Sequence, residues 1–387
     1  MCVFAPNHIL PHYFLNCKGA CSRLKILHVI TDSNIGGAGT VLLNLMRRAD
    51  KENFDYTIAV PTGSKLVPRL YELGISVVEL DGLAEQSLNF PAISRIKKLI
   101  KQLRPDIVHT HAALSARIAA RLAGRTKIVH TRHSVFEVTP EQKTLPRRIV
   151  TRITNNLFSD KIIAVSPAAV ENLTDLGTNA RRITVVFNGA EPAQKLTPTE
   201  LCEARTQFGI TEGDFVCAII ARLEEVKGHA YILQAAEQLQ DYPIKIIFAG
   251  TGVLESDIRA AVQAANLPNV IVAGFVREIY KLENIIDVQL NASYGTEATS
   301  LALLEGMSLS KPAIVSDFGG NPYVIQDGEN GLVVPKKDAN AIAAAILRLY
   351  NDRELTRRLS ARAKHDFETK FTAEIMAKNT EAIYRGL

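Results

Sequence analysis

The 387-residue sequence has no tryptophan, only five cysteines and no long hydrophobic run. Five scattered cysteines give no disulfide framework, so the cytoplasm is the expected compartment. No segment approaches the roughly 18 consecutive apolar residues of a membrane span. Residues 1–23 hold three of the cysteines and two histidines, but nothing around them completes a closed zinc site. We expect residues 1–23 to form a disordered extension.

Several motifs of well-known enzyme classes are also absent. The sequence has no Asp-x-Asp pair, with which some sugar transferases hold Mg²⁺ or Mn²⁺ on a diphosphate. It lacks a Walker phosphate loop, a Gly-x-Ser-x-Gly elbow and a His-Glu-x-x-His motif. His109 and His111 stand at the end of an expected strand, and we read them as pointing to opposite faces. Neither a metal site nor a resident cofactor is therefore expected.

Charge is distributed unevenly along the chain. Residues 1–185 contain 25 Lys and Arg against 14 Asp and Glu, whereas the remainder contains 20 against 26. A basic half attracts anionic surfaces such as membranes, although solvated helix faces explain such charge equally well. Nucleic acid is not an expected partner, because no zinc-finger spacing or aromatic-basic RNA-binding segment accompanies the charge. The basic clusters are Arg47 with Arg48, Lys97 with Lys98, Lys101 and Arg104, and Arg147 with Arg148 and Arg152.

Short apolar runs alternate with helical patterns, which is typical of a mostly parallel sheet covered by helices. One series of runs lies between residues 25 and 165, and a second lies between residues 215 and 334. We predict an α/β protein of two facing, doubly wound Rossmann-like domains with a ligand cleft between them. The expected parts are an N-terminal domain at 24–187, a C-terminal domain at 188–371, and a helix at 372–387 that packs back toward the first domain.

The segment from Glu297 to Glu305 is the most informative part of the sequence. Its two carboxylates stand eight residues apart, and Thr299 or Ser300 is a plausible helix N-cap. Glu297 would lie in a loop and Glu305 on the helix, roughly 10–12 Å further along the axis. The helix N-terminus between them attracts phosphate. This layout suits a sugar, a diphosphate and a ribose in a row, whereas two solvated glutamates are the ordinary alternative.

A second pattern, Arg222 with Lys227, follows the first strand of the second half. An arginine fork and a lysine point charge, both expected in the open cleft, are suited to clamping a diphosphate. Glu224 and Glu225 are alternative partners for these cations at the surface.

Glycine turns follow two of the expected strands, at residues 36–39 and 319–320. Such turns let backbone amides approach an anion or a sugar hydroxyl. The first turn is similar to a dinucleotide-binding turn, but residues 59–62, at the end of the second strand, include no acidic residue. A nicotinamide-dependent enzyme is therefore disfavoured.

Taken together, these residues resemble the family 4 retaining glycosyltransferases, which have two facing Rossmann-like domains in the GT-B arrangement. The resemblance covers nearly all of residues 24–387 and is most specific between Glu297 and Val334. It rests on Gly36–Gly39, His111, Asn188–Gly189, Arg222 with Lys227 and Gly228, Gly250 with Gly252, Gly274–Phe275, Glu297 with Glu305, and Gly319–Gly320.

The resemblance implies a metal-independent enzyme that moves a hexose-type sugar from a nucleoside diphosphate sugar, by family frequency UDP-linked, with retention of configuration. The implied acceptor is a glycan or a lipid-linked sugar in cell-surface polysaccharide or glycolipid synthesis. Polyprenyl-phosphate acceptors would bring a cytoplasmic protein to the inner face of the cell membrane. The basic cluster from Lys97 to Arg104 is the expected contact with that anionic surface.

The resemblance also assigns acceptor binding to the N-terminal domain and nucleotide-sugar binding to the C-terminal domain, and it implies roles for single residues. Arg222 and Lys227 would neutralise the leaving diphosphate, Glu297 would bind the donor sugar, and His111 would lie beside it. At Tyr323 the family usually has a glutamate, which leaves the sugar contacts there open. The implied donor-binding residues are Gly37, Gly250, Gly252, Phe275, Val276, Arg277, Ser300, Leu301, Glu305, Gly319 and Gly320.

Three other functions are weighed against this one. A nucleotide-sugar epimerase of the same architecture and a catalytically silent nucleotide-sugar-binding paralogue both remain open. Hydrolysis is disfavoured, because glycosidase carboxylates flank the scissile bond, whereas Glu297 and Glu305 would lie along the donor.

Overall fold

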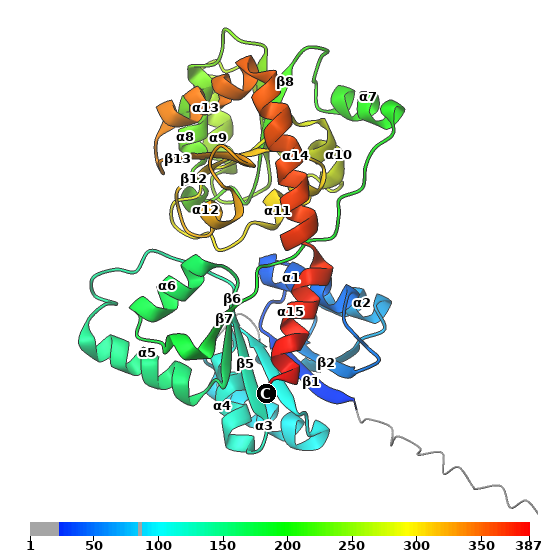
Figure 1. The fold of residues 1–387 in the computed structure, drawn as a ribbon, viewed down its shortest axis with the longest axis vertical. Coiled ribbons are helices and arrows are strands. Elements are labelled where there is room, and N and C mark those ends of the chain that lie inside the picture. Colours follow the sequence, from blue (N-terminus) through cyan, green and yellow to red (C-terminus); the bar gives the residue numbers. More distant parts are fainter. Residues whose placement is uncertain (1–22, 84–86) are drawn as a thin grey trace, which may run out of the picture.

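The computed structural model describes residues 23–83 and 87–387. The expected extension at 1–23 therefore lies outside the described residues, apart from Arg23. Two domains stack along the long axis of the molecule (Figure 1). Each is built on one parallel sheet with helices on both faces. The predicted two-domain α/β architecture is confirmed.

The N-terminal domain contains a seven-stranded parallel sheet in the order β3-β2-β1-β4-β5-β6-β7. Its strands are β1 (Leu24–Ile30), β2 (Phe54–Pro61), β3 (Ser76–Leu80), β4 (Ile107–His111), β5 (Lys127–Arg132), β6 (Lys161–Ala164) and β7 (Ile183–Val185). Its helices are α1 (Gly37–Arg47), α2 (Leu66–Glu72), α3 (Phe90–Leu103), α4 (Leu114–Ala123), α5 (Leu145–Leu157), α6 (Pro167–Asp175) and the 3-10 turn η1 (Ala180–Arg182). Apolar residues fill the central strands because helices cover both faces of the sheet.

The C-terminal domain contains a six-stranded parallel sheet in the order β10-β9-β8-β11-β12-β13. Its strands are β8 (Phe215–Ile220), β9 (Ile244–Ala249), β10 (Val270–Gly274), β11 (Val288–Asn291), β12 (Ala313–Ser316) and β13 (Gly331–Val334). Its helices are α7 (Pro198–Gln207), the 3-10 turn η2 (Glu225–Lys227), α8 (His229–Glu237), α9 (Glu255–Ala264), α10 (Ile279–Ile285), α11 (Leu301–Ser308), α12 (Asn321–Val324), α13 (Ala339–Asn351) and α14 (Arg353–Lys370).

The strand order reverses between β1 and β4 in the first sheet and between β8 and β11 in the second. At such a reversal the chain leaves neighbouring strands in opposite directions and opens a crevice at their carboxyl ends. The fold therefore provides one crevice in each domain, where doubly wound sheets bind ligands.

The chain crosses between the domains twice, and the two crossing segments lie side by side. Ala190 donates to the carbonyl of Phe371 at 3.0 Å and accepts from the amide of Ala373 at 2.9 Å. A Cβ on Gly189 would lie 2.4 Å from the carbonyl oxygen of Thr372, so no side chain fits there. After the second crossing, α15 (Ala373–Arg385) packs its Tyr384 into the core of the N-terminal domain. The C-terminal helix thus belongs structurally to the first domain.

The strands agree with the sequence reading except at the edge of the first sheet, where β7 was not predicted. It has three residues, directly after the basic turn η1, and the short apolar segment Ile183–Phe187 that contains it was not among the predicted strands. No helix among the described residues is long and apolar enough to cross a membrane.

Candidate functional site

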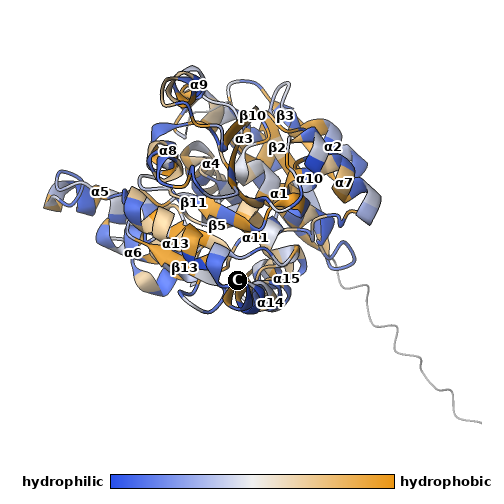
Figure 2. Ribbon diagram, turned by 90° about the horizontal axis from the view of Figure 1, so that it is seen from above, coloured by the Kyte–Doolittle hydropathy of each residue, from blue (hydrophilic) through white to orange (hydrophobic). Residues whose placement is uncertain are grey.

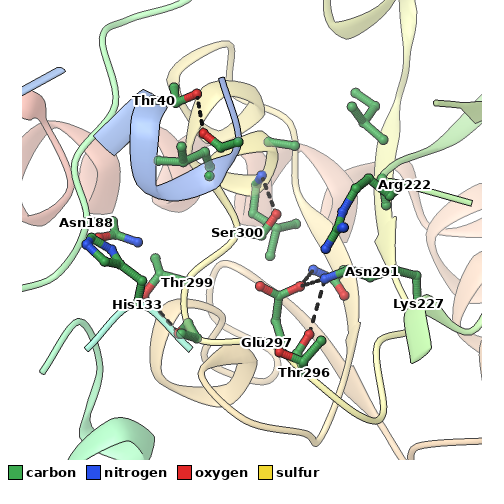
Figure 3. Close-up of a pocket in the computed structure, with 18 of the residues that line it drawn as sticks. Thr40, His133, Asn188, Arg222, Lys227, Asn291, Thr296, Glu297, Thr299 and Ser300 are labelled. Carbon is green, nitrogen blue, oxygen red and sulfur yellow. Dashed lines mark hydrogen bonds and ion pairs between the residues drawn. The ribbon is translucent and has the colours of Figure 1, made fainter. Parts of the chain in front are cut away.

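A cavity of about 930 Å³ lies between the two crevices (Figure 3). Ligand pockets commonly measure roughly 300–1,000 Å³, so a nucleotide sugar is within its capacity. The N-terminal domain contributes Asp32, residues 34–38, Thr40, His133, Ser134 and the linker residue Asn188, and the C-terminal domain contributes residues 218–222, Lys227, 289–291 and 296–303.

Lys227 and Glu297 form an ion pair in this cavity. Lys227 Nζ lies 3.0 Å from Glu297 Oε2 and donates to the carbonyl of Thr296 at 3.2 Å. The two side chains are only 15% and 9% exposed, so Lys227 is more enclosed than the open cleft we expected. The turn at Gly228 makes this possible, because a Cβ there would lie 2.2 Å from the carbonyl oxygen of Ala292.

The carboxylate of Glu297 is anchored through one oxygen. Its Oε2 also accepts from Asn291 Nδ2 at 3.2 Å and from Ser293 Oγ at 3.1 Å. Oε1 takes no hydrogen bond from any described residue. A carboxylate fixed in this way offers Oε1 as a ready acceptor for ligand hydroxyl groups.

The glycine pair predicted to contact the donor supports this loop from behind. A Cβ on Gly319 would lie 2.2 Å from the carbonyl oxygen of Glu297, and one on Gly320 would lie 1.5 Å from that of Ala298. The amide of Gly320 donates to the carbonyl of Glu297 at 3.1 Å. Neither glycine lines the cavity, so they position the loop rather than touch its contents.

Arg222 lines the same cavity but is held less firmly than Lys227. Its Nη1 lies 2.6 Å from Glu224 Oε1, and its side chain is 71% exposed. This is the surface pairing that the sequence left open for Arg222, whereas Glu225 instead accepts from the hydroxyl of Tyr294 at 3.1 Å. Because an exposed ion pair contributes little free energy, an anion in the cavity can recruit Arg222 at small cost.

Two helices begin at the cavity. The hydroxyl of Ser300 accepts from the amide of Leu303 at 3.4 Å, which confirms Ser300 as the N-cap of α11, and both Ser300 and Leu301 line the cavity. On the opposite wall, α1 begins at Gly37, which also lines the cavity and has open space where a Cβ would point. Helix N-termini attract anions, so both walls favour a negatively charged ligand.

The histidine that faces the cavity is His133, whereas His111 lies behind it. His111 is buried, does not line the cavity, and bonds through its Nδ1 to His133 Nε2 at 2.8 Å. His133 Nδ1 and Oδ1 of the linker residue Asn188 are buried without a partner among the described residues. The sequence reasoning did not select His133, although this residue directly follows the end of β5, where doubly wound sheets bind ligands, and it named Asn188 only as part of the resemblance.

His111 belongs to a chain of buried rings. Its Nε2 lies 3.0 Å from His28 Nδ1, and His28 Nε2 lies 3.3 Å from the hydroxyl of Tyr384 on α15. That hydroxyl lies 2.5 Å from His109 Nδ1. Burial lowers the pKa of all four histidines, that of His133 to about 4 and that of His28 to about 3, so the rings are neutral at pH 7. The chain holds His133 in place through hydrogen bonds.

The expectation that His109 and His111 point to opposite faces is wrong. Residues two apart on a strand share a face, and their ring centroids lie 4.6 Å apart. With His28 they bring three ring nitrogens within 4.8 Å of one another, close enough to hold a metal ion. Hydrogen bonds among these rings, Tyr384 and Thr131 already engage those nitrogens.

Glu305 lies one turn into α11, just beyond the residues that line the cavity, and its carboxyl group meets that of Glu283 on α10. The two carboxyl groups share a hydrogen bond, and Glu283 is buried with its Oε1 unpartnered. Burial raises the pKa of both groups, and the charge of Glu305 raises that of Glu283 further. Glu283 therefore holds the proton and donates to Glu305. A partner for Glu305 was not visible in the sequence, because the two stand 22 positions apart on different helices.

The remaining predicted donor-binding residues lie at the ends of β9 and β10, outside the cavity lining. Gly250 has φ +145°, and a Cβ on it would lie 2.0 Å from the carbonyl oxygen of Ala221. A Cβ on Gly252 would similarly lie 2.3 Å from that of Leu223. Both glycines therefore pack against the turn that carries Arg222. Phe275, Val276 and Arg277 follow β10 next to this turn, and Phe275 and Arg277 are exposed.

Tyr323 bridges the two domains. Its hydroxyl donates to Glu171 Oε1 of α6 at 2.7 Å. Nearby, the hydroxyl of Thr299 donates to the carbonyl of Val165 at 2.8 Å, and Phe136 forms an antiparallel bridge with Thr296. These contacts join the N-terminal domain to the loop that carries Glu297 and its neighbours.

Two family models match most of the chain. Residues 35–194 match the Glycosyltransferase Family 4 model, and residues 202–366 match the model of Glycosyl transferases group 1. The chain belongs to the group 1 glycosyltransferases of family 4. It is 28% identical over 305 residues to the putative glycosyltransferase EpsD of Bacillus subtilis (strain 168), covering 75% of this chain and 80% of that protein.

One further relative supports this assignment, and one solved structure shows the same fold. The chain is 26% identical to the UDP-Gal:alpha-D-GlcNAc-diphosphoundecaprenol alpha-1,3-galactosyltransferase of Escherichia coli, covering 87% of this chain and 91% of that protein. Its fold is similar to that of Anabaena HepE in complex with UDP, with a TM-score of 0.81 and 20% identity over 94% of this chain and 100% of the other. The glycosyltransferase thus has the GT-B fold expected from the sequence.

The Glu283–Glu305 pair generates a prediction about pH. Folding raises the pKa of such a carboxyl group. As the pH rises above about 4.5, the usual pKa of a glutamate, the protein loses stability, because the unfolded chain releases the proton and the native state keeps it. Each pH unit in that range costs about 1.4 kcal/mol per retained proton. Glu283→Gln keeps a hydrogen-bond donor to Glu305 but replaces the titratable carboxyl group with an amide. It should therefore raise the free energy of unfolding at pH 8 and change it little at pH 4.5.

Urea denaturation of the wild type and the variant at both pH values measures this difference. An equal effect of the substitution at the two pH values would show that Glu283 does not retain its proton on folding.

Proposed function

We propose that this glycosyltransferase moves a hexose from a nucleoside diphosphate sugar, UDP-linked by the frequency of such donors in the family, to a glycan or lipid-linked acceptor with retention of configuration and without a metal ion. The observation that carries the proposal is the meeting of Lys227, Arg222 and the N-terminus of α11 in one cavity beside the anchored carboxylate of Glu297.

The proposed chemistry needs negative charge stabilised on the departing nucleotide. Lys227 is fixed in advance by Glu297, and Arg222 is free to leave Glu224 for the incoming diphosphate. Fixed donors in an enclosed site lower such barriers by a few kcal/mol each. The breaking bond joins the sugar to phosphate, so its electron pair goes to the diphosphate. The acceptor hydroxyl attacks from the same face, and its proton passes to the departing phosphate oxygen.

Glu297 then contacts the donor sugar rather than attacking it. Its Oε2 is occupied by three donors, so its free Oε1 is the acceptor available to the hydroxyl groups of the sugar. His133, with its unpartnered Nδ1, takes the role beside the sugar that the sequence reading gave to His111. Glu305 is the proposed ribose contact, held by the proton of Glu283.

The named relatives support the acceptor class. One is named for transfer to a diphosphoundecaprenol-linked sugar, and such an acceptor implies work at the cytoplasmic face of a membrane in polysaccharide or glycolipid synthesis. The alternatives are an epimerase of the same fold and a silent nucleotide-sugar-binding paralogue. A protein that binds donors tightly but transfers sugar to no lipid or glycan acceptor would favour the second.

Arg222→Ala tests the diphosphate clamp. Turnover should fall about 10²-fold or more, as when one fixed electrostatic donor is removed. Stability should stay unchanged because the side chain is mostly exposed.

Lys227→Ala should lose comparable turnover and also about 3–5 kcal/mol of stability, because it leaves Glu297 buried and unpaired. Steady-state kinetics with thermal melts measure both, and near-wild-type turnover in both variants would remove the clamp from the account.

Chelation tests the metal-independent chemistry. Protein treated with EDTA and returned to metal-free buffer should keep its transfer rate, because cations of the chain itself neutralise the diphosphate. Activity that disappears on chelation and returns on titration with Mg²⁺ or Mn²⁺ would show a different catalytic strategy.

Calorimetry separates the two glutamates. Glu305→Gln should weaken binding of the bare nucleoside diphosphate and of the full donor alike, by about 1.5–3 kcal/mol for a charge-assisted contact. Glu297→Gln should weaken binding of the full donor more than that of the bare nucleotide, because Glu297 contacts the sugar and reaches the diphosphate only through Lys227. Glu283→Gln is the matched control and should bind both ligands like the wild type. Equal losses for both ligands in the two main variants would contradict this division of roles.

A further inference from the structure

Helix α5 carries an apolar face that no part of the described chain covers. Its only buried residue is the polar Asn155, which donates to the hydroxyl of Thr178 at 2.8 Å and accepts from Arg117 at 3.1 Å. In Figure 1 the helix lies on the outer flank of the N-terminal domain, and in Figure 2 it projects from the margin of the molecule. The helix is therefore attached to the domain by polar contacts.

The apolar side chains of α5 face solvent. They recur every four residues along one side of the helix, with Val150 beside them, and each is between 46% and 69% exposed. They are Leu145, Ile149, Val150, Ile153 and Leu157. Exposed apolar surface concentrated in this way marks a contact site for another molecule.

Unpaired arginines border this face. A groove of about 490 Å³ between α5 and residues 174–181 is lined by Arg148, Arg152 and Arg181. None of the three forms an ion pair with a described carboxylate. Residues 143–157 contain four cations and no acidic residue, and Lys143 alone among them is paired, with Asp175 at 3.1 Å.

We propose that α5 docks the protein on an anionic membrane, with its apolar side chains in the boundary between headgroups and acyl chains and its arginines on lipid phosphates. A helix with one apolar face and flanking cations lies in the plane of such an interface. A second copy of this chain is a poorer occupant, because a two-fold contact would place the arginines of one α5 against those of the other.

The basic cluster on α3, which the charge pattern suggested first, lacks the second half of this arrangement. Lys98, Lys101 and Arg104 are exposed, but Ile96 and Ile100 of the same helix are buried in the domain core. The cations of α3 can attract an anionic surface, but this helix has no exposed apolar face to insert into a membrane. It therefore serves as the matched control for α5.

Docking through α5 also brings the membrane to the helix that follows the cavity wall in the chain. Residues 135–144 connect His133 and Ser134 of the cavity wall directly to the start of α5. The inference rests on the proposed function in one respect, that docking would bring the enzyme to a lipid-linked acceptor. Docking itself is measured without any sugar.

The absence of tryptophan from the chain gives a direct test. Ile153→Trp in the full-length protein introduces a single tryptophan, on the exposed face of α5, which can be excited apart from the ten tyrosines. Its emission should shift to the blue with vesicles of phosphatidylcholine mixed with phosphatidylglycerol, less so at high salt, and not with phosphatidylcholine alone. Phe90→Trp, at an exposed position of α3, should not shift. No shift at position 153 with the anionic vesicles, or a shift that depends on protein concentration without vesicles, would overturn the proposal.

Co-sedimentation with the same vesicles provides the second measurement. Ile149→Ser combined with Ile153→Ser should lower partitioning onto the anionic vesicles about tenfold or more, since two apolar side chains that the membrane would bury are lost. Arg148→Glu with Arg152→Glu should also release the protein, whereas Lys98→Glu with Lys101→Glu should have a smaller effect. Equal losses on the two helices would overturn the assignment to α5. Unchanged melting temperature and nucleotide binding show that the variants are folded, and loss of docking with transfer to a soluble acceptor intact would leave the transferase proposal standing.

Discussion

The ion pair between Lys227 and Glu297 holds together two segments that are distant in the sequence, the turn after β8 and the loop after β11. The pair is nearly enclosed, so each charge depends on the other, and breaking one side of such a pair costs about 3–5 kcal/mol. Asn291 and Ser293 complete the shell around the carboxylate. The surrounding glycines follow from this constraint, since Gly228 and Gly320 allow backbone approaches that any side chain would block.

The second constraint is the double crossing between the domains. Ala190 is hydrogen-bonded to both Phe371 and Ala373, so the two connections behave as one strap at the edge of the cleft. Beyond it, α15 brings Tyr384 against the buried histidines whose chain ends at His133. The last helix of the polypeptide therefore helps to set the cavity wall, although it lies far from the cavity. Contacts such as Tyr323 with Glu171 hold the domains together on the other side.

Much of the fold was readable because its signals are local. Apolar runs predicted most strands, and the segment around the two carboxylates predicted a loop for Glu297, an N-cap at Thr299 or Ser300 and a helix for Glu305. The predictions that failed concern features that depend on tertiary contacts. The pairing of Glu283 with Glu305 joins two helices, and the enclosure of Lys227 comes from packing. The histidines on β4 were misread for a simpler reason, since residues two apart on a strand share a face.

The glycines show the same division. Their positions suggested ligand contacts, but Gly250, Gly252 and Gly319 are required by backbone packing next to the site. The exposure of α5 was equally invisible, because its apolar spacing is the one that normally predicts a buried helix face. Only the structure shows that this face has no partner within the described chain.

A structure of the protein with a bound nucleoside diphosphate, chosen from UDP, GDP and ADP by affinity, tests the central claim most directly. The account predicts the diphosphate at the N-terminus of α11, within salt-bridge distance of Lys227 and of Arg222, with Arg222 released from Glu224. A diphosphate bound elsewhere, with Arg222 still paired to Glu224, would contradict it.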